Sequence, residues 1–222
     1  VATPGSGRPW RVGRQRAPSS PHAMLALLAG PSGTTSLCLE AAAKVIPHPA
    51  KAKSGGEDAH MILPATGEGA ILGAYAVYDG VGAWANEGVD SGLFSRTLAT
   101  QTALALSAQS WAEALDLTAA LSSGLAATDE VGSTTACVLC LERSGRLRAL
   151  NVGDSGFRVL SGRPTAVKAR STEQTHGFNF PYQLGTGSST TAQDGATYEF
   201  RVAAGDVILL GTDGVFDNVR AR

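Results

Sequence analysis

The sequence has no long hydrophobic run, and this excludes a helix that crosses a bilayer. The short apolar run from Met24 to Ala29 is below the length of a signal-peptide core and far below the ~18 residues of a membrane span. Acidic residues are also missing from the first 39 positions, where the first acid is Glu40. We therefore expect a soluble protein whose N-terminal segment differs in character from the rest.

Cysteine is scarce as well, with only Cys38, Cys137 and Cys140 in the chain. An odd and small number argues against a disulfide framework and favours a reducing compartment. Cys137 and Cys140 lie in the apolar run Thr134 to Leu141, which is typical of a buried strand. Residues three apart in a strand face opposite sides. The pair is therefore predicted to be two small buried hydrophobes rather than a redox or zinc motif.

The overall charge is nearly balanced, at -1 with a pI near 6.5, which gives no electrostatic reason to expect nucleic acid or a membrane surface as partner. Four arginines lie in residues 1–39, and that composition fits either an organellar transit segment or a disordered tail. We divide the chain into this segment and a folded domain at 40–222. The predicted location is the mitochondrion or chloroplast, and otherwise the cytoplasm.

The folded part alternates apolar runs with turns rich in Gly, Asp and Ser. It predicts a strand, then two helices, and then a series of strands, a mixed α+β order with segregated helices. Strands are expected at 70–79, 133–142, 146–152, 157–160, 198–202 and 207–210, and helices at 92–107 and 111–129.

Carboxylates recur where an apolar strand gives way to glycine. Asp79-Gly80 and Asp213-Gly214 both follow nearly fully apolar strands, and Asp154 follows Gly153. One Asp-Gly alone is an ordinary turn, but two after buried strands favour a metal site. Grouped carboxylates repel one another unless a cation neutralises them. Oxygen ligands suit Mg²⁺ or Mn²⁺, and the scarcity of His and Cys argues against zinc.

Seven motifs occur in order over roughly residues 45–219 and carry a resemblance to a known family. They are 48–60 (HPAKAKSGGEDAH), 79–84 (DGVGAW), 88–96 (GVDSGLFSR), 132–136 (GSTTA), 151–157 (NVGDSGF), 174–184 and 211–218 (GTDGVFDN). Together they resemble the PPM (PP2C) family of metal-dependent protein phosphatases, and are most similar to the organellar branch related to yeast Ptc7.

The resemblance implies an antiparallel β-sandwich flanked by helices in the order α/β/β/α, with a metal site at one end of the sheets. In the family a last metal-binding aspartate follows several dozen residues after the position of Asn218, so the domain in 40–222 is expected to be C-terminally truncated. Two ions, Mg²⁺ or Mn²⁺, and a weaker third are implied. The implied ligands are Glu57, Asp58, Asp79, the Gly80 carbonyl, Asp154, Asp213 and Asp217.

The function implied by the resemblance is hydrolysis of phosphoserine and phosphothreonine in proteins by a water that two metals activate. Asp79 and Asp213 would be the central catalytic ligands. Lys53, four residues before Glu57, matches a position where the family commonly has an arginine that grips the phosphate. We expect a monomer. Many members have His where this chain has Val81, so His176 is a candidate proton donor, although an ordinary loop histidine fits equally well.

Three other interpretations compete with a phosphatase. The chain could be an inactive pseudophosphatase that binds phosphoproteins, which Val81 favours. Ser155 in Gly-Asp-Ser-Gly suggests a serine protease, but the other protease segments are missing. The segment 213–217 (DGVFD) suggests a haloacid dehalogenase, but the Asp-x-Asp nucleophile motif is missing.

Overall fold

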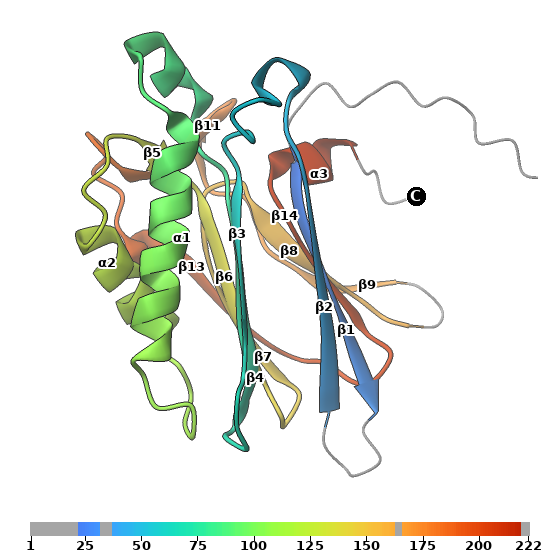
Figure 1. The fold of residues 1–222 in the computed structure, drawn as a ribbon. Helices are drawn as coiled ribbons and strands as arrows, with labels where there is room; N and C mark the ends of the chain where they lie inside the picture. Colours follow the sequence, from blue (N-terminus) through green and yellow to red (C-terminus); the bar gives the residue numbers. More distant parts are fainter. Residues whose placement is uncertain (1–21, 32–36, 163–165, 219–222) are drawn as a thin grey trace, which may run out of the picture.

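Two five-stranded antiparallel sheets face each other, and helices cover one of them (Figure 1). The computed structural model describes residues 22–31, 37–162 and 166–218. The first sheet has the order β2-β1-β14-β8-β9 and the second β13-β7-β6-β4-β3. The strands of the first are β1 (His22–Pro31), β2 (Leu37–Ile46), β8 (Gly156–Leu160), β9 (Val167–Arg170) and β14 (Val207–Gly211). Those of the second are β3 (Ala59–Pro64), β4 (Ile71–Tyr78), β6 (Ala136–Glu142), β7 (Arg146–Val152) and β13 (Ala196–Arg201).

Shorter elements lie at one end of these sheets. Two strand pairs form there: β5 (Ser133–Thr134) with β12 (Leu184–Gly185), and β10 (Thr175–Gly177) with β11 (Phe180–Pro181). The helices are α1 (Ser91–Ser107), α2 (Leu117–Ala126) and α3 (Asp213–Asn218), and the 3-10 turns are η1 (Pro49–Lys51), η2 (Gly82–Glu87) and η3 (Ala192–Asp194). No helix in the described ranges is long and apolar enough to cross a membrane.

Strand β6 shows how the sequence builds two cores. Cys140 and Val138 face the core beneath α1 and α2, whereas Cys137 and Leu139 face the core between the two sheets. The strand alternation predicted for the two buried cysteines is therefore confirmed. A strand that is apolar on both faces must be covered on both faces, which fixes β6 as a central strand of the sandwich.

Helices α1 and α2 form the layer on the outer face of the second sheet (Figure 1). The helix predicted over 111–129 is shorter in the structure, because Asp116 caps its N-terminus by accepting the Ala119 N–H at 2.9 Å. Trp111 lies before the helix and donates its indole N–H to the Leu106 carbonyl. The predicted antiparallel sandwich with flanking helices is confirmed. In the described part of the chain the first sheet carries only the short α3, at one end.

Strands β1 and β2 correct the predicted domain boundary at residue 40. Strand β1 pairs with β14 from Met24 opposite Gly211 to Leu28 opposite Val207, and β2 begins at Leu37. The short apolar run in the N-terminal segment is thus a strand of the sandwich. A short apolar run is ambiguous when its pairing partner lies far away in the sequence. Residues 1–21 of the segment 1–39, which was predicted to be transit-like or disordered, lie outside the described residues.

Strand register gathers the predicted acidic positions at one edge of the sandwich. Ala59 at the start of β3 pairs with Tyr78 at the end of β4. Gly156 at the start of β8 pairs with Gly211 at the end of β14. Because β4 and β7 are both antiparallel to β6, they end at the same edge. We call this end, where Glu57, Asp58, Asp79, Asp154 and Asp213 lie, the acidic edge.

Candidate active site

Asp58 is a deeply buried carboxylate of the acidic edge. It lies just before β3, and only 5% of its surface is exposed. The Thr212 hydroxyl donates to Oδ2 at 3.3 Å, while Oδ1 is buried without a hydrogen-bond partner among the described residues. A buried carboxylate oxygen without a donor is costly, so this position favours a cation as its partner.

The first turn of α1 holds the segment that carries Glu57 and Asp58. The Ser95 hydroxyl donates to the Glu57 carbonyl, and the Arg96 guanidinium donates to the Gly56 carbonyl at 3.3 Å. Arg96 also donates to Asp90, the residue that caps α1, at 2.9 Å. The acidic pair is therefore fixed by a helix end from a different part of the sequence.

Asp79 ends β4 and is joined to the neighbouring strand by its backbone. Its carbonyl accepts the Thr135 N–H at 3.0 Å, and its N–H donates to the Thr135 hydroxyl at 3.3 Å. Gly80 follows in a tight space, since a Cβ there would lie 2.5 Å from the Glu57 carbonyl oxygen. Glycine at this position is what allows β4 to end beside Glu57.

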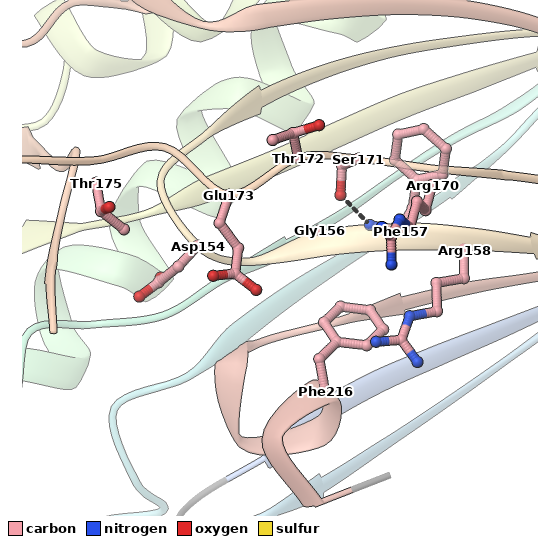
Figure 2. Close-up of a pocket in the computed structure, with 10 residues that line it drawn as sticks. All are labelled: Asp154, Gly156, Phe157, Arg158, Arg170, Ser171, Thr172, Glu173, Thr175 and Phe216. Atoms are coloured by element: carbon pink, nitrogen blue, oxygen red, sulfur yellow. Dashed lines mark hydrogen bonds between the residues drawn. The ribbon is translucent and has the colours of Figure 1, made fainter. Parts of the chain in front are cut away.

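Asp154 lies where the chain crosses from the second sheet to the first. Gly153 has φ +100 and no room for a Cβ beside the Tyr182 carbonyl, so this crossing needs glycine. Asp154 borders a pocket of about 360 Å³, into which the Glu173 carboxylate also projects (Figure 2). Across this pocket the Arg158 guanidinium lies 4.6 Å from the centroid of the Phe216 ring. Asp217 is exposed on α3, one turn after Asp213.

The acidic edge is electrostatically strained. Burial and the nearby Asp213 and Glu57 raise the pKa of Asp58 to about 7. Burial, together with repulsion from Asp58 and Asp213, holds the pKa of Asp79 well above its usual range. Burial and Asp213 likewise raise the pKa of Asp154 to about 6. These carboxylates therefore lie close enough to repel one another, and no cationic group among the described residues neutralises all of them.

The donor set fits hard divalent cations. It consists of carboxylates and backbone carbonyls, and it includes the unpartnered Oδ1 of Asp58. Within 22–31, 37–162 and 166–218, no three Asp, Glu, His or Cys side chains come together at the spacing of a ligand cluster. The side chains are grouped but not closed around one ion. That arrangement suits Mg²⁺ or Mn²⁺ sites in which several ligands act through water.

Comparison with known proteins matches the chain to phosphatases. It is 42% identical over 193 residues to Probable protein phosphatase 2C 80 of Arabidopsis thaliana, covering 85% of this chain and 44% of the relative. It is 39% identical over 157 residues to the Drosophila mojavensis protein phosphatase PTC7 homolog fig, covering 64% and 49%. The solved photosystem II phosphatase PBCP superposes with a TM-score of 0.71 at 33% identity, covering 89% of this chain and 69% of that one. This chain belongs to the PP2C (PPM) family.

The limits of the match are equally clear. The serine/threonine phosphatase Stp1 of Staphylococcus aureus has a TM-score of 0.56 at 16% identity, and this likeness supports the PP2C fold alone. No family sequence profile matches the chain. The chain spans 44% and 35% of the length of the two first-matched Arabidopsis relatives. The comparisons therefore establish the family and the fold of the shared part.

The lysine that reaches the acidic edge of this PP2C domain is one that the motif did not single out. Lys51 forms an ion pair with the carboxylate of Glu57. Lys53, predicted as the phosphate ligand, has an exposed side chain two residues further on. The turn η1 ends at Lys51, and such a turn places alternate residues in different directions. A spacing rule taken from the sequence could not distinguish the two lysines.

Ser155, Val81 and His176 are the positions that suggested other functions or another proton donor. Ser155 is 1% exposed and bonds to the Thr135 hydroxyl at 2.6 Å, which does not fit an accessible nucleophile. Val81 lines a groove beside the acidic edge, and the exposed His176 lines the same groove. Thr212 and Glu173 also contribute to the edge. Local pattern does not predict either role, because Thr212 bonds to Asp58 at a distance of 154 positions in the chain and Glu173 is brought beside Asp154 by the fold.

Proposed function

We propose that this chain is a metal-dependent serine/threonine protein phosphatase domain. The observation that carries the proposal is the acidic edge itself. Carboxylates from the ends of strands in both sheets are held together with raised pKa values. A binding module has no electrostatic reason to assemble such a group, whereas a two-metal hydrolase requires one.

Asp79, the Gly80 carbonyl and Asp213 would hold two Mg²⁺ or Mn²⁺ ions, with Glu57 and Asp58 acting through water, and Asp154 with Asp217 would serve a weaker third ion. Bound ions of this kind lower the pKa of a water and stabilise the charge on the phosphoryl oxygens.

The protein's own residues prepare this site. Thr212 fixes one oxygen of Asp58 and leaves the other for a ligand. The backbone pairing of Asp79 with Thr135 fixes the direction in which the Asp79 side chain leaves β4. Lys53 is proposed to hold the substrate phosphate, and Lys51 is a second candidate because it already reaches Glu57.

The direct test is Mn²⁺-dependent hydrolysis of p-nitrophenyl phosphate and of a phosphothreonine peptide, with EDTA as the metal-free control. Asp79→Ala is expected to lower kcat about a hundredfold or more. The control is Glu68→Ala, since Glu68 is an exposed carboxylate in the loop between β3 and β4, at the opposite end of β4 from Asp79. Loss of less than tenfold in Asp79→Ala would sink the site assignment.

A pseudophosphatase is the second candidate, and Val81 favours it because many family members have a proton-donating His there. It predicts metal binding or phosphopeptide binding without turnover. Calorimetric titration with Mn²⁺, beside the hydrolysis assay, separates the two. Metal binding with no hydrolysis of either substrate would support the binding module.

An organellar location remains part of the proposal. The support is the acid-free, arginine-containing stretch at residues 1–21 and the similarity to PBCP, a photosystem II phosphatase. The proposed substrates are phosphoserine and phosphothreonine proteins. Fractionation of chloroplasts and mitochondria, with an antibody to the domain, would test the location. Recovery in the cytosol alone would contradict it.

A further inference from the structure

A groove of about 560 Å³ opens beside the acidic edge, at the end of the sheet where β5, β10, β11 and β12 lie. Its wall includes Val81, Trp84, Ser133, Phe180 and Gln183. We propose that this groove binds apolar residues that flank the phosphorylated residue of a protein substrate. The inference rests on the function proposed above and adds a preference for substrate sequence.

The groove is continuous with the acidic edge through the backbone. Val81, which lines it, directly follows Gly80, and the Val81 N–H donates to the Ser133 carbonyl at 2.9 Å. Gly80 forms a bridge with Thr134 on the same short strand, β5. An extended peptide advances about 3.3 Å per residue. A peptide with its phosphorylated residue at the edge therefore places residues two or three positions away within reach of the groove.

One wall of the groove is fixed by a short chain of hydrogen bonds. The Trp84 indole N–H donates to the Ser133 hydroxyl at 2.8 Å, and that hydroxyl donates to the Gln183 side-chain carbonyl at 2.7 Å. The segment that carries Gln183 is anchored by pairing of Leu184 with Thr134. A wall fixed before binding loses little freedom when a ligand arrives, which is the usual condition for selectivity.

An exposed aromatic side chain borders the groove. Phe180 is 54% exposed, and its ring centroid lies 5.3 Å from that of His176. His176 in turn stacks on Tyr182 with centroids 4.2 Å apart. Exposed apolar surface gathered around a concavity is typical of an interaction site.

Charge selects what the groove accepts. Among the described residues, its lining contains no Asp, Glu, Lys or Arg. The pocket on the Asp154 side of the edge is different, because it is lined by Glu173, Arg158 and Arg170 (Figure 2). A charged side chain entering the uncharged groove would lose hydration without gaining a partner. The lining combines aromatic and aliphatic residues with uncharged polar ones, so it favours apolar flanking residues over charged ones.

The test compares two phosphothreonine peptides, one with Leu and one with Ser at the second and third positions on both sides of the phosphothreonine. For the wild-type chain with Mn²⁺, kcat/KM is expected to be about fivefold higher for the Leu peptide, because a partly buried leucine contributes favourable transfer. Phe180→Ala is expected to reduce that preference below about twofold and to leave hydrolysis of p-nitrophenyl phosphate unchanged. The matched control is Phe178→Ala, since Phe178 is fully exposed and does not line the groove.

A binding assay makes the test independent of turnover. Fluorescence anisotropy of labelled Leu and Ser peptides, with Mn²⁺ present, should give the same order of affinity and the same loss in Phe180→Ala. Equal values for the two peptides, or equal effects of Phe180→Ala and Phe178→Ala, overturn the proposal. A loss on p-nitrophenyl phosphate in Phe180→Ala also overturns it, because the residue would then act on the acidic edge. Failure of the proposed function itself appears differently, as wild-type protein without hydrolysis of p-nitrophenyl phosphate.

Discussion

Lys51 forms an ion pair with Glu57 at the acidic edge, while the exposed Lys53 lies two residues further along the same turn. A cation beside the proposed site could hold the substrate phosphate if Glu57 engages a metal or its water. The pairing makes Lys51 and Lys53 a natural comparison, because they share a residue type and a segment.

We predict that one of these lysines contributes to phosphate binding and the other does not. If it is Lys51, Lys51→Ala raises KM for p-nitrophenyl phosphate about tenfold, while Lys53→Ala stays within twofold. Steady-state kinetics at fixed Mn²⁺ measures both. The reverse order would support the assignment of Lys53 by family resemblance, and no change in either variant would remove both lysines from the site.

The stability of the metal-free domain is predicted to fall as the pH rises from 4 to 7. Burial raises the pKa of Asp58 to about 7 in the folded protein, against an ordinary value of 3.8 for an exposed aspartate. Between these values the folded state binds more protons than the unfolded state, so the free energy of unfolding decreases with pH. Urea denaturation in EDTA at pH 5 and pH 7 measures this.

The control for that experiment is Asp58→Asn, which carries no charge at either pH and should show a shallower dependence. Saturating Mn²⁺ should also raise stability more at pH 7 than at pH 5, because ionised carboxylates bind the metal. Equal stability of the wild-type domain at both pH values would contradict the prediction.

Ser155 is predicted to be a structural residue. Ser155→Ala removes its bond to the Thr135 hydroxyl and should lower the free energy of unfolding by about 1 kcal/mol. Phosphatase activity should stay within about threefold of wild type, since the hydroxyl is buried away from solvent. Chemical denaturation and p-nitrophenyl phosphate hydrolysis check the two parts. Abolished hydrolysis in a stably folded Ser155→Ala would show that the serine takes part in chemistry.

Gly80 is predicted to tolerate no side chain. In Gly80→Ala the added methyl would meet the carbonyl oxygens of Glu57 and Ser91 at 2.5 and 2.8 Å. The expected cost is about 1–3 kcal/mol of stability, together with weaker Mn²⁺ binding. Gly67→Ala is the matched control, because nothing lies within 4 Å of its added methyl. Similar stability for the two variants, measured by urea denaturation, would count against this reading of the edge.

The strand ends were the most predictable part of this protein. Apolar strands that finish in Asp-Gly placed Asp79 and Asp213 correctly at the ends of β4 and β14, because local pattern determines where a strand stops. Pairing was less predictable. Strand β1 pairs with β14, with Met24 opposite Gly211, and local sequence pattern does not indicate a contact between segments so far apart in the chain.

The side chains that support the site also could not be predicted from the sequence. The Thr212 hydroxyl donates to the Asp58 carboxylate, 154 positions away in the chain, and the Ser95 hydroxyl donates to the Glu57 carbonyl, 38 positions away. The identity of such residues follows from three-dimensional packing, since many serines and threonines with the same local pattern have no such role. The choice between Lys51 and Lys53 has the same origin, because it depends on the direction of a single short turn.

The crossing at Gly153–Ser155 has a mechanical consequence. Asp79 belongs to one sheet and Asp213 follows a strand of the other, so their separation depends on how far the two sheets slide past each other. The buried side chains that set this alignment, Leu139 and Phe157 among them, lie in the core between the sheets. Repacking that core would change the spacing of the proposed metal ligands without altering any of them, so a change in Mn²⁺ affinity would report a change in the alignment of the two sheets.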